Sequence, residues 1–189
     1  MYMKKCILIF SLLCLSTIAL QAQFTPGIKG GLNVTDISNL NGDNRISGHV
    51  GLFLHHTINS NWCVQPELLY SGQGQKYMTN TGERTITLSY IQVPVMVQYY
   101  PVKQLYFEFG PQVSFLTAAH SKGSGDDKVE VDGAYNKADF GVNVGLGVAA
   151  TSNIGFYGRY NAGLTDITKN NNISQMNRVG QLGMYVRLH

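Results

Sequence analysis

Apolar and polar side chains alternate along most of this chain, most clearly in the segment 89–100, SYIQVPVMVQYY. Ile91, Val93, Val95, Val97 and Tyr99 form one apolar row, whereas the residues between them are more polar. A side-chain period of two predicts a β-strand, and about ten such residues in a tilted strand span a bilayer. We therefore predict a strand that presents its apolar row to lipid.

The same pattern recurs in eight segments that are separated by polar stretches. The predicted strands cover residues 27–34, 48–58, 62–74, 89–100, 105–116, 139–150, 154–163 and 179–188. Short turns follow the second, fourth and sixth strands, and polar loops at 36–47, 76–84, 120–137 and 164–176 follow the others. Short periplasmic turns and longer external loops are typical of outer-membrane barrels. The predicted fold class is all-β: an eight-stranded antiparallel up-and-down transmembrane β-barrel in a Gram-negative outer membrane, with both termini periplasmic.

The composition favours a surface that faces lipid. Charged residues make up 13% of the 189 residues, while Gly (21) and Tyr (11) are abundant. This charged share is about half of that in an average soluble domain. The alternative is an ordinary soluble β-protein.

The N-terminus has the features of a signal peptide, which we predict at residues 1–22, with the barrel domain at 23–189. Lys4 and Lys5 precede a short apolar run, and Ala22 offers a small residue for cleavage. Cleavage after Ala19 is an alternative, and a lipid anchor on Cys14 is disfavoured because a leucine precedes it. Without the leader, the chain has 12 basic and 11 acidic residues. This near-neutral balance gives no reason to expect a nucleic-acid partner.

If the apolar rows face lipid, the alternate rows face the lumen and carry three charges of each sign: Lys29, Glu67, Glu108, Asp139, Arg159 and Arg187. The interior of an eight-stranded barrel is only wide enough to be filled by side chains, and a buried unpaired charge costs several kcal/mol. We therefore predict a lumenal network that joins Glu67 and Glu108 to Arg159 and Arg187 and leaves no wide pore. The alternative places these charges on the wet face of a soluble sheet.

Aromatic residues near the short turns predict a girdle at the membrane interface: Trp62, Tyr99, Tyr100, Tyr106 and Phe156. Three prolines, Pro66, Pro94 and Pro111, fall inside predicted strands, where each removes a donor from the hydrogen-bond ladder. Local bulges are one way to accommodate them.

Motifs for catalysis or cofactor binding are weak throughout. His55 and His56 are neighbours on a strand, so they point to opposite faces and cannot easily share a metal ion. Gly145 and Gly147 resemble part of a dinucleotide loop, but no helical pattern follows them. The acidic stretch 126–132 lacks the ligand spacing of an EF-hand. We expect no catalytic, cofactor-binding or metal-binding residues, with a barrel-rim enzyme as an alternative.

Two segments, QPELLYSGQG at 65–74 and YIQVPVMVQYY at 90–100, carry a family resemblance, and shorter matches continue it over nearly the whole mature chain. Together they make the chain resemble the PorT-type outer-membrane β-barrel family of the Bacteroidetes. The resemblance implies prolines within the strands and an outer-membrane location. It departs at Gln92, where the family commonly has Glu. The namesake of the family is implicated in secretion, whereas most members have no assigned task.

These patterns predict a barrel with a filled interior that has a structural or interaction role. Its contacts would be outer-membrane lipid and a protein partner that binds the four external loops. Two alternatives with other activities are a narrow pore for small solutes and a soluble, lipocalin-like barrel that holds a lipid against inward apolar rows.

Overall fold

The computed structural model describes residues 24–39, 42–79, 82–123, 129–169 and 174–188. The predicted signal peptide lies outside these residues. Two short elements, β6 (Val129–Glu130) and the 3-10 helix η1 (Asp132–Ala134), lie between β5 and β7. The eight long strands are β1 (Phe24–Ile37), β2 (Asp43–Thr57), β3 (Trp62–Thr79), β4 (Gly82–Val102), β5 (Leu105–Gly123), β7 (Ala138–Ala149), β8 (Ile154–Gly163) and β9 (Asn177–Arg187).

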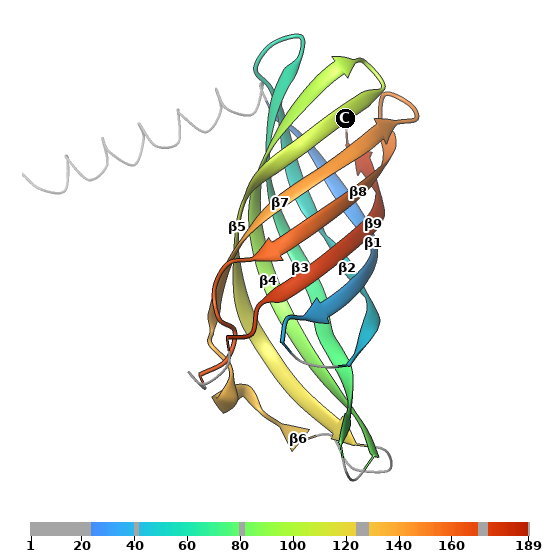
Figure 1. The fold of residues 1–189 in the computed structure, drawn as a ribbon. Coiled ribbons are helices and arrows are strands. Elements are labelled where there is room, and N and C mark those ends of the chain that lie inside the picture. The colour runs from blue at the N-terminus through green and yellow to red at the C-terminus, as the bar shows by residue number, and fades with distance from the viewer. Residues whose placement is uncertain (1–23, 40–41, 80–81, 124–128, 170–173, 189) are drawn as a thin grey trace, which may run out of the picture.

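The long strands form a closed antiparallel ring (Figure 1). Each strand pairs with its neighbour in the chain, β5 pairs with β7, and β1 pairs with β9 to complete the circle. The predicted eight-stranded up-and-down barrel is confirmed. The pair Gly27–Arg187 places the start of β1 and the end of β9 at one end of the barrel. This end also carries the turns 58–61, 103–104 and 150–153, and we call it the turn end; the opposite end is the loop end.

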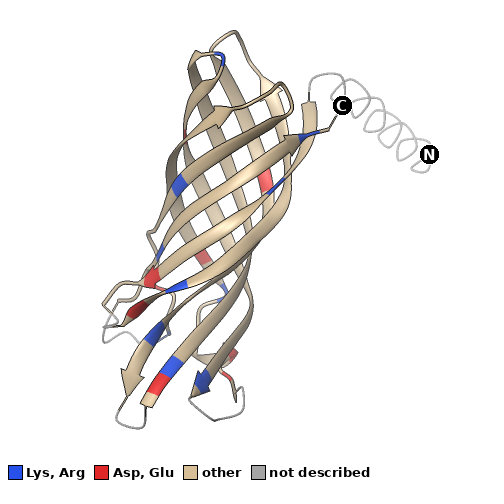
Figure 2. Cartoon of the chain, turned by 90° about the vertical axis from the view of Figure 1, so that its right-hand side faces the viewer, with Lys and Arg blue, Asp and Glu red and all other residues tan. Residues whose placement is uncertain are grey.

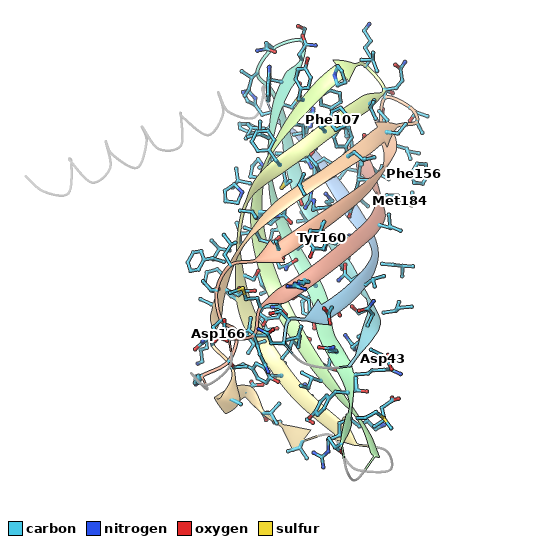
Figure 3. All side chains as sticks on the ribbon, in the orientation of Figure 1. Asp43, Phe107, Phe156, Tyr160, Asp166 and Met184 are labelled. Carbon is cyan, nitrogen blue, oxygen red and sulfur yellow. The ribbon has the colours of Figure 1, made fainter. Side chains whose placement is uncertain are left out.

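The two rows of each strand differ in environment as the alternation predicts. Outward positions carry exposed apolar side chains such as Val144 and Leu182, whereas inward positions carry buried polar ones such as Gln98 and Asn143. Phe156 is among the residues on the outer face (Figure 3). Apolar rows that point outward exclude the lipocalin-like arrangement, in which they would line the interior.

The strands are longer at the loop end than the sequence pattern predicted. The expected loop at 76–84 is wrong, because β3 continues to Thr79 and β4 begins at Gly82. The expected loops at 36–47 and 120–137 are shorter for the same reason, since β1, β2 and β5 extend into them. As a result β3, β4 and β5 project beyond the other strands (Figure 1).

Within the projecting part of β4 the sidedness is reversed. Thr85 and Thr87 lie on the outer row, while Ile86, Leu88 and Tyr90 point inward and are buried. From Ile91 onward the outer row is apolar and the inner row is mostly polar. Since a polar outer face needs water, lipid contact on this strand ends near residues 90–91.

The three strand prolines are accommodated without bulges. Cross-strand pairs are missing beside Pro66 in the β2–β3 ladder, beside Pro94 in the β3–β4 ladder and beside Pro111 in the β4–β5 ladder. The register is the same on both sides of each gap, and the register shifts of these ladders lie elsewhere. Each proline therefore interrupts the ladder locally and leaves the strand alignment intact.

Candidate functional site

Four buried charged residues meet in the middle of the lumen, and we call them the ion cluster: Lys29 of β1, Glu67 of β3, Glu108 of β5 and Arg159 of β8. Arg159 Nη1 and Nη2 donate to the two carboxylate oxygens of Glu67 at 2.9 and 2.8 Å. Arg159 Nε donates to Glu108 Oε1 at 2.8 Å, and Lys29 Nζ donates to Glu67 Oε1 at 3.0 Å. The cluster therefore ties four strands together across the lumen.

Gly145 allows the side chain of Arg159 to reach Glu108. Glu108 pairs with Gly145 of β7, and Gly145 pairs with Arg159 on its other side. A Cβ atom at Gly145 would lie 3.2 Å from Glu108 Oε1 and closer still to the backbone of β8. Because the middle residue of the row has no side chain, the guanidinium reaches the carboxylate over β7.

The charges of the cluster cancel, with two cations and two anions. Two parallel N–H···O bonds from one guanidinium to one carboxylate are among the strongest charge-assisted contacts in proteins. The remaining acceptor capacity of the acids is used by amides, since Gln65 Nε2 donates to Glu67 and Gln98 Nε2 donates to Glu108. Such pairing is what a buried charge requires, because an unpaired one is strongly destabilising.

A layer of aromatic rings, which we call the aromatic layer, lies between the ion cluster and the turn end: Phe53, Tyr100, Tyr106, Tyr157 and Tyr185. Phe53 and Tyr185 meet edge to face at 6.0 Å between ring centroids, and Tyr100 and Tyr106 meet at 5.1 Å. The ring of Tyr157 faces Lys29 of the ion cluster, and Lys29 Nζ is 3.9 Å from the ring centroid. The ring centroids of Tyr106 and Tyr185 are 6.4 Å apart, so the rings contact one another across the lumen.

The aromatic layer corrects the predicted girdle. Tyr100 and Tyr106 belong to the inward rows, since they alternate with the outward Tyr99 and Phe107, and Tyr106 is 2% exposed. Trp62, Tyr99 and Phe156 are exposed on the outer face, and the rings of Trp62 and Tyr99 are 4.8 Å apart. Three of the five residues therefore lie on the outer face near the turn end, and their place at a membrane interface stays a prediction.

Arg187 and Asp139 lie outside the ion cluster. Arg187 is half-buried at the turn end, where Nη2 donates to the hydroxyl of Tyr100 at 3.1 Å. Tyr100 donates to Gln98, so Arg187 is linked to Glu108 only through two uncharged side chains. The predicted direct contact of Arg187 with the acids is wrong, because the aromatic layer separates them along the barrel axis.

Asp139 lies nearer the loop end, in contact with uncharged groups. It accepts hydrogen bonds from Thr165 Oγ1 at 2.7 Å and from Asn177 Nδ2 at 3.0 Å. No cation of the described residues forms an ion pair with it. The structure thus brings together four of the six charged residues that the alternation placed in the lumen.

Uncharged polar side chains continue the filling toward the loop end. His49 Nδ1 contacts Asn33 Oδ1 at 2.6 Å, and its other ring nitrogen contacts the Tyr157 hydroxyl. Asn33 Nδ2 donates to Ser71 Oγ at 3.0 Å, and Gln181 Nε2 donates to Asn33 Oδ1 at 3.2 Å. No sequence motif marks these residues, and their inward parity is the signal that could have identified them.

A buried apolar cluster, which we call the apolar cap, lies at the loop end: Ile37, Ile86, Leu88, Tyr90, Ala119, Tyr135 and Ile167. Two of its side chains come from the connections between strands. Tyr135 follows η1 and forms an isolated bridge with Thr168, next to Ile167. Asn136 Nδ2 donates to the carbonyls of Asp166 and Thr168 at 2.8 and 3.0 Å. The two long connections therefore fold onto each other above the lumen.

Asp166 organises the second of these connections. Its Oδ1 accepts the backbone N–H groups of Thr168 at 3.0 Å and Gln175 at 3.1 Å. The backbone N–H of Thr168 lowers the pKa of the Asp166 carboxyl below its ordinary value. Burial raises the pKa of Tyr135 to about 12, so this cap residue is uncharged at neutral pH. Figure 3 shows Asp166 at the loop end of the barrel.

Metal-binding groups do not come together in the part of the chain that the structure describes, where no three His, Cys, Asp or Glu side chains form a candidate site. His55 is buried, whereas its neighbour His56 faces outward against Phe24. Among the described residues no helix is long and apolar enough to cross a membrane.

The sequence matches a family model described as the outer membrane protein beta-barrel domain over residues 21–169. The chain belongs to this family. The protein is therefore an outer-membrane β-barrel, in agreement with its apolar outer face and closed ring. No curated protein matches the chain.

Solved structures share the fold at low sequence identity. Ail, the attachment invasion locus protein of Yersinia pestis, has a TM-score of 0.53 at 13% identity, over 88% of this chain and 99% of Ail. Neisserial surface protein A has a TM-score of 0.55 at 11% identity, over 87% of this chain and 97% of that protein. The matched Ail crystal holds sucrose octasulfate, a heparin analogue.

Proposed function

We propose that this outer-membrane barrel is closed to solutes and acts through its loop end, which faces the outside of the cell and binds a protein partner. The observation that carries the proposal is the succession of fillings along the lumen. From the turn end to the loop end these are the aromatic layer, the ion cluster, buried amides and the apolar cap. A barrel of eight strands filled in this way has no room for a water-filled path.

Conductance measurements test the closed lumen. The purified protein, without its leader, is inserted into planar lipid bilayers, and a general porin treated in the same way is the positive control. We expect no stable unitary currents from this protein. Reproducible single-channel steps would overturn the proposal and favour the narrow pore.

The orientation is part of the proposal and has its own test. Single cysteines are placed at Thr79, beside the β3–β4 connection, and at Ser60, in a turn, with the native Cys63 changed to Ser. A membrane-impermeant maleimide added to intact cells should label Thr79→Cys and leave Ser60→Cys unlabelled until the cells are lysed. The reverse result would place the loop end in the periplasm. Mass spectrometry of the inserted protein should show loss of residues 1–22.

We assign partner binding to the four connections at the loop end, 36–47, 76–84, 120–137 and 164–176. Charged residues gather toward this end of the barrel (Figure 2). Both signs are interspersed, as in the exposed pair of Lys76 and Glu83 at 3.3 Å. A mixed surface of this kind suits a protein partner better than a polyanion such as the heparin analogue found with Ail.

Two measurements separate these ligand classes. The protein should pass through a heparin column at about 0.15 M salt, where exposed charges are screened beyond roughly 8 Å. A photo-crosslinking residue at the exposed Met78 should trap one protein reproducibly on cells, whereas the same residue at the lipid-facing Phe156 should not. Heparin retention without a Met78-specific adduct would replace the protein partner by a polyanion.

The finer family placement, in the PorT-type group of the Bacteroidetes, is also proposed. It is supported by the segments 65–74 and 90–100 and by the prolines within them. Since the namesake is implicated in secretion, the set of secreted proteins in a deletion strain is the informative readout. We propose no catalytic role.

A further inference from the structure

The turn end differs from the loop end in its charge. Among the described residues near the turn end, Lys103 and Arg187 are the charged groups outside the ion cluster. The nearest carboxylates, Glu67 and Glu108, are already held by Arg159 deeper in the lumen. This mouth of the barrel is therefore cationic.

Arg187 has unused donors in this mouth. Its Nη2 donates to the Tyr100 hydroxyl at 3.1 Å, and its Nη1 makes a long contact of 3.5 Å with the carbonyl of Ser152. Its Nε is buried without any acceptor, and none of the ion pairs among the described residues includes Arg187. A half-buried guanidinium without an anion is unusual, because charged groups away from bulk water are normally paired.

A second donor without a partner lies beside it. Tyr185 is 5% exposed, and its hydroxyl makes no hydrogen bond. Its ring lies 5.5 Å from Arg187 Cζ and covers Gly155, where a Cβ would be 2.4 Å from the hydroxyl oxygen. Gly155 is the second residue of β8, which begins directly after the turn that contains Ser152. Both side chains therefore reach from β9 toward the β7–β8 turn.

We propose that Arg187 and Tyr185 bind a phosphate-type oxyanion in the turn-end mouth of the barrel. A guanidinium fork and a phenol hydroxyl supply directed donors, and the described residues of the turn end include no free carboxylate that would compete with them. The oxyanion has two sources: free phosphate from the aqueous side, or the phosphodiester of a phospholipid head group. The exposed Trp62–Tyr99 pair lies at this rim, and such aromatic pairs lie at the depth of lipid head groups.

Phosphorus NMR of the folded protein in dodecyl maltoside micelles tests the site, with inorganic phosphate as the probe. We expect saturable broadening of the phosphate resonance. Arg187→Gln should weaken binding by about tenfold or more, and Tyr185→Phe, which keeps the ring, by about threefold. Lys103→Gln removes the other cation of the turn end and should leave the affinity within about twofold. Heat-modifiable gel migration confirms that each variant is folded.

The source of the oxyanion is found by competition. Short-chain phosphatidylglycerol that displaces phosphate at lower concentrations than phosphatidylcholine does would identify a lipid head group, and no displacement by either would identify free phosphate. Absence of saturable phosphate binding to the wild-type protein would overturn the proposal. Equal weakening by Lys103→Gln and Arg187→Gln would also overturn it, because binding would then follow diffuse charge. A closed lumen and loop-end binding do not depend on this result.

Discussion

Replacement of Arg159 by alanine should destabilise the barrel more than replacement of an exposed arginine does. Arg159 donates three charge-assisted hydrogen bonds of 2.8 to 2.9 Å to two carboxylates. Without it Glu67 keeps Lys29, but Glu108 keeps only the amide of Gln98 at 3.2 Å, and the cluster acquires a net charge of −1. Loss of one partner from a buried ion pair costs about 3–5 kcal/mol, and we expect a decrease of this size in the free energy of unfolding.

The assay is urea unfolding in lipid vesicles, followed by the emission of Trp62, which is the single tryptophan of the chain. Arg178→Ala is the matched control, since Arg178 is exposed on β9. The double variant Arg159→Ala/Glu108→Gln restores a neutral lumen and should recover at least about 1 kcal/mol relative to Arg159→Ala. A decrease of less than about 1 kcal/mol for Arg159→Ala, or a double variant that is no more stable, would refute the paired cluster.

Three further predictions test other parts of the structure. Gly110→Ala should reduce the folded yield, because the added Cβ would lie 2.0 Å from a carbonyl oxygen of β4. Gly180→Ala is the control and should leave the yield unchanged, since its Cβ would lie 3.8 Å from the nearest atom. Gel migration of the unboiled protein measures the folded yield of both variants. The lowered pKa of Asp166 means that its stabilisation of the connection 164–169 is full above the ordinary Asp value of about 3.9 and is lost as the pH falls through the lowered pKa. Hydrogen-exchange protection there should fall with acid, and Asp166→Asn should abolish this dependence on pH. On the outer row of β4, Val95→Arg, in the middle of the apolar row, should cost about 2–4 kcal/mol and Thr87→Arg about 0–1 kcal/mol by urea unfolding in vesicles; equal costs would place residue 87 in lipid.

The strand period, together with the assignment of the apolar rows to lipid, was enough to predict which side chains face the lumen. Since successive residues of a strand point to opposite sides, Lys29, Glu67, Glu108, Asp139 and Arg159 could be placed inside from the sequence, and all five are buried. The same parity already placed Tyr100 and Tyr106 inside. The prediction of a girdle there was wrong because it relied on distance from the turns and disregarded parity.

The predicted contacts of Arg159 with Glu67 and Glu108 are present, whereas the predicted contact of Arg187 with these acids is not. Charge balance alone could not separate the two cases, because contacts between inward residues depend on the stagger of strands that are distant in sequence. Arg159 reaches Glu108 because Gly145 lies between them in one row of the ring, and this requires two registers to be known. Arg187 has the correct parity but lies at the end of β9, on the far side of the aromatic layer. Parity predicts that a side chain points into the lumen, but it does not give the position of that side chain along the barrel axis. Two inward side chains can pair only if they lie at similar positions along this axis.

The change of sidedness on β4 was visible in the sequence as a shift of phase, since Ile86, Leu88 and Tyr90 are even-numbered and the apolar row that starts at Ile91 is odd-numbered. It has a physical cause in the solvent outside the barrel. From Ile91 to Tyr99 the strand rises about 27 Å, and a tilt of about 40° reduces its height to roughly 20 Å, close to the apolar band of outer-membrane barrels.

Within this band lipid provides no hydrophobic drive for an apolar interior, so buried hydrogen bonds and ion pairs hold the strands together. Beyond it water surrounds the barrel and favours an apolar interior, and here the apolar cap takes over. The cap therefore lies outside the lipid band, on the part of the barrel that we propose as the site of partner binding.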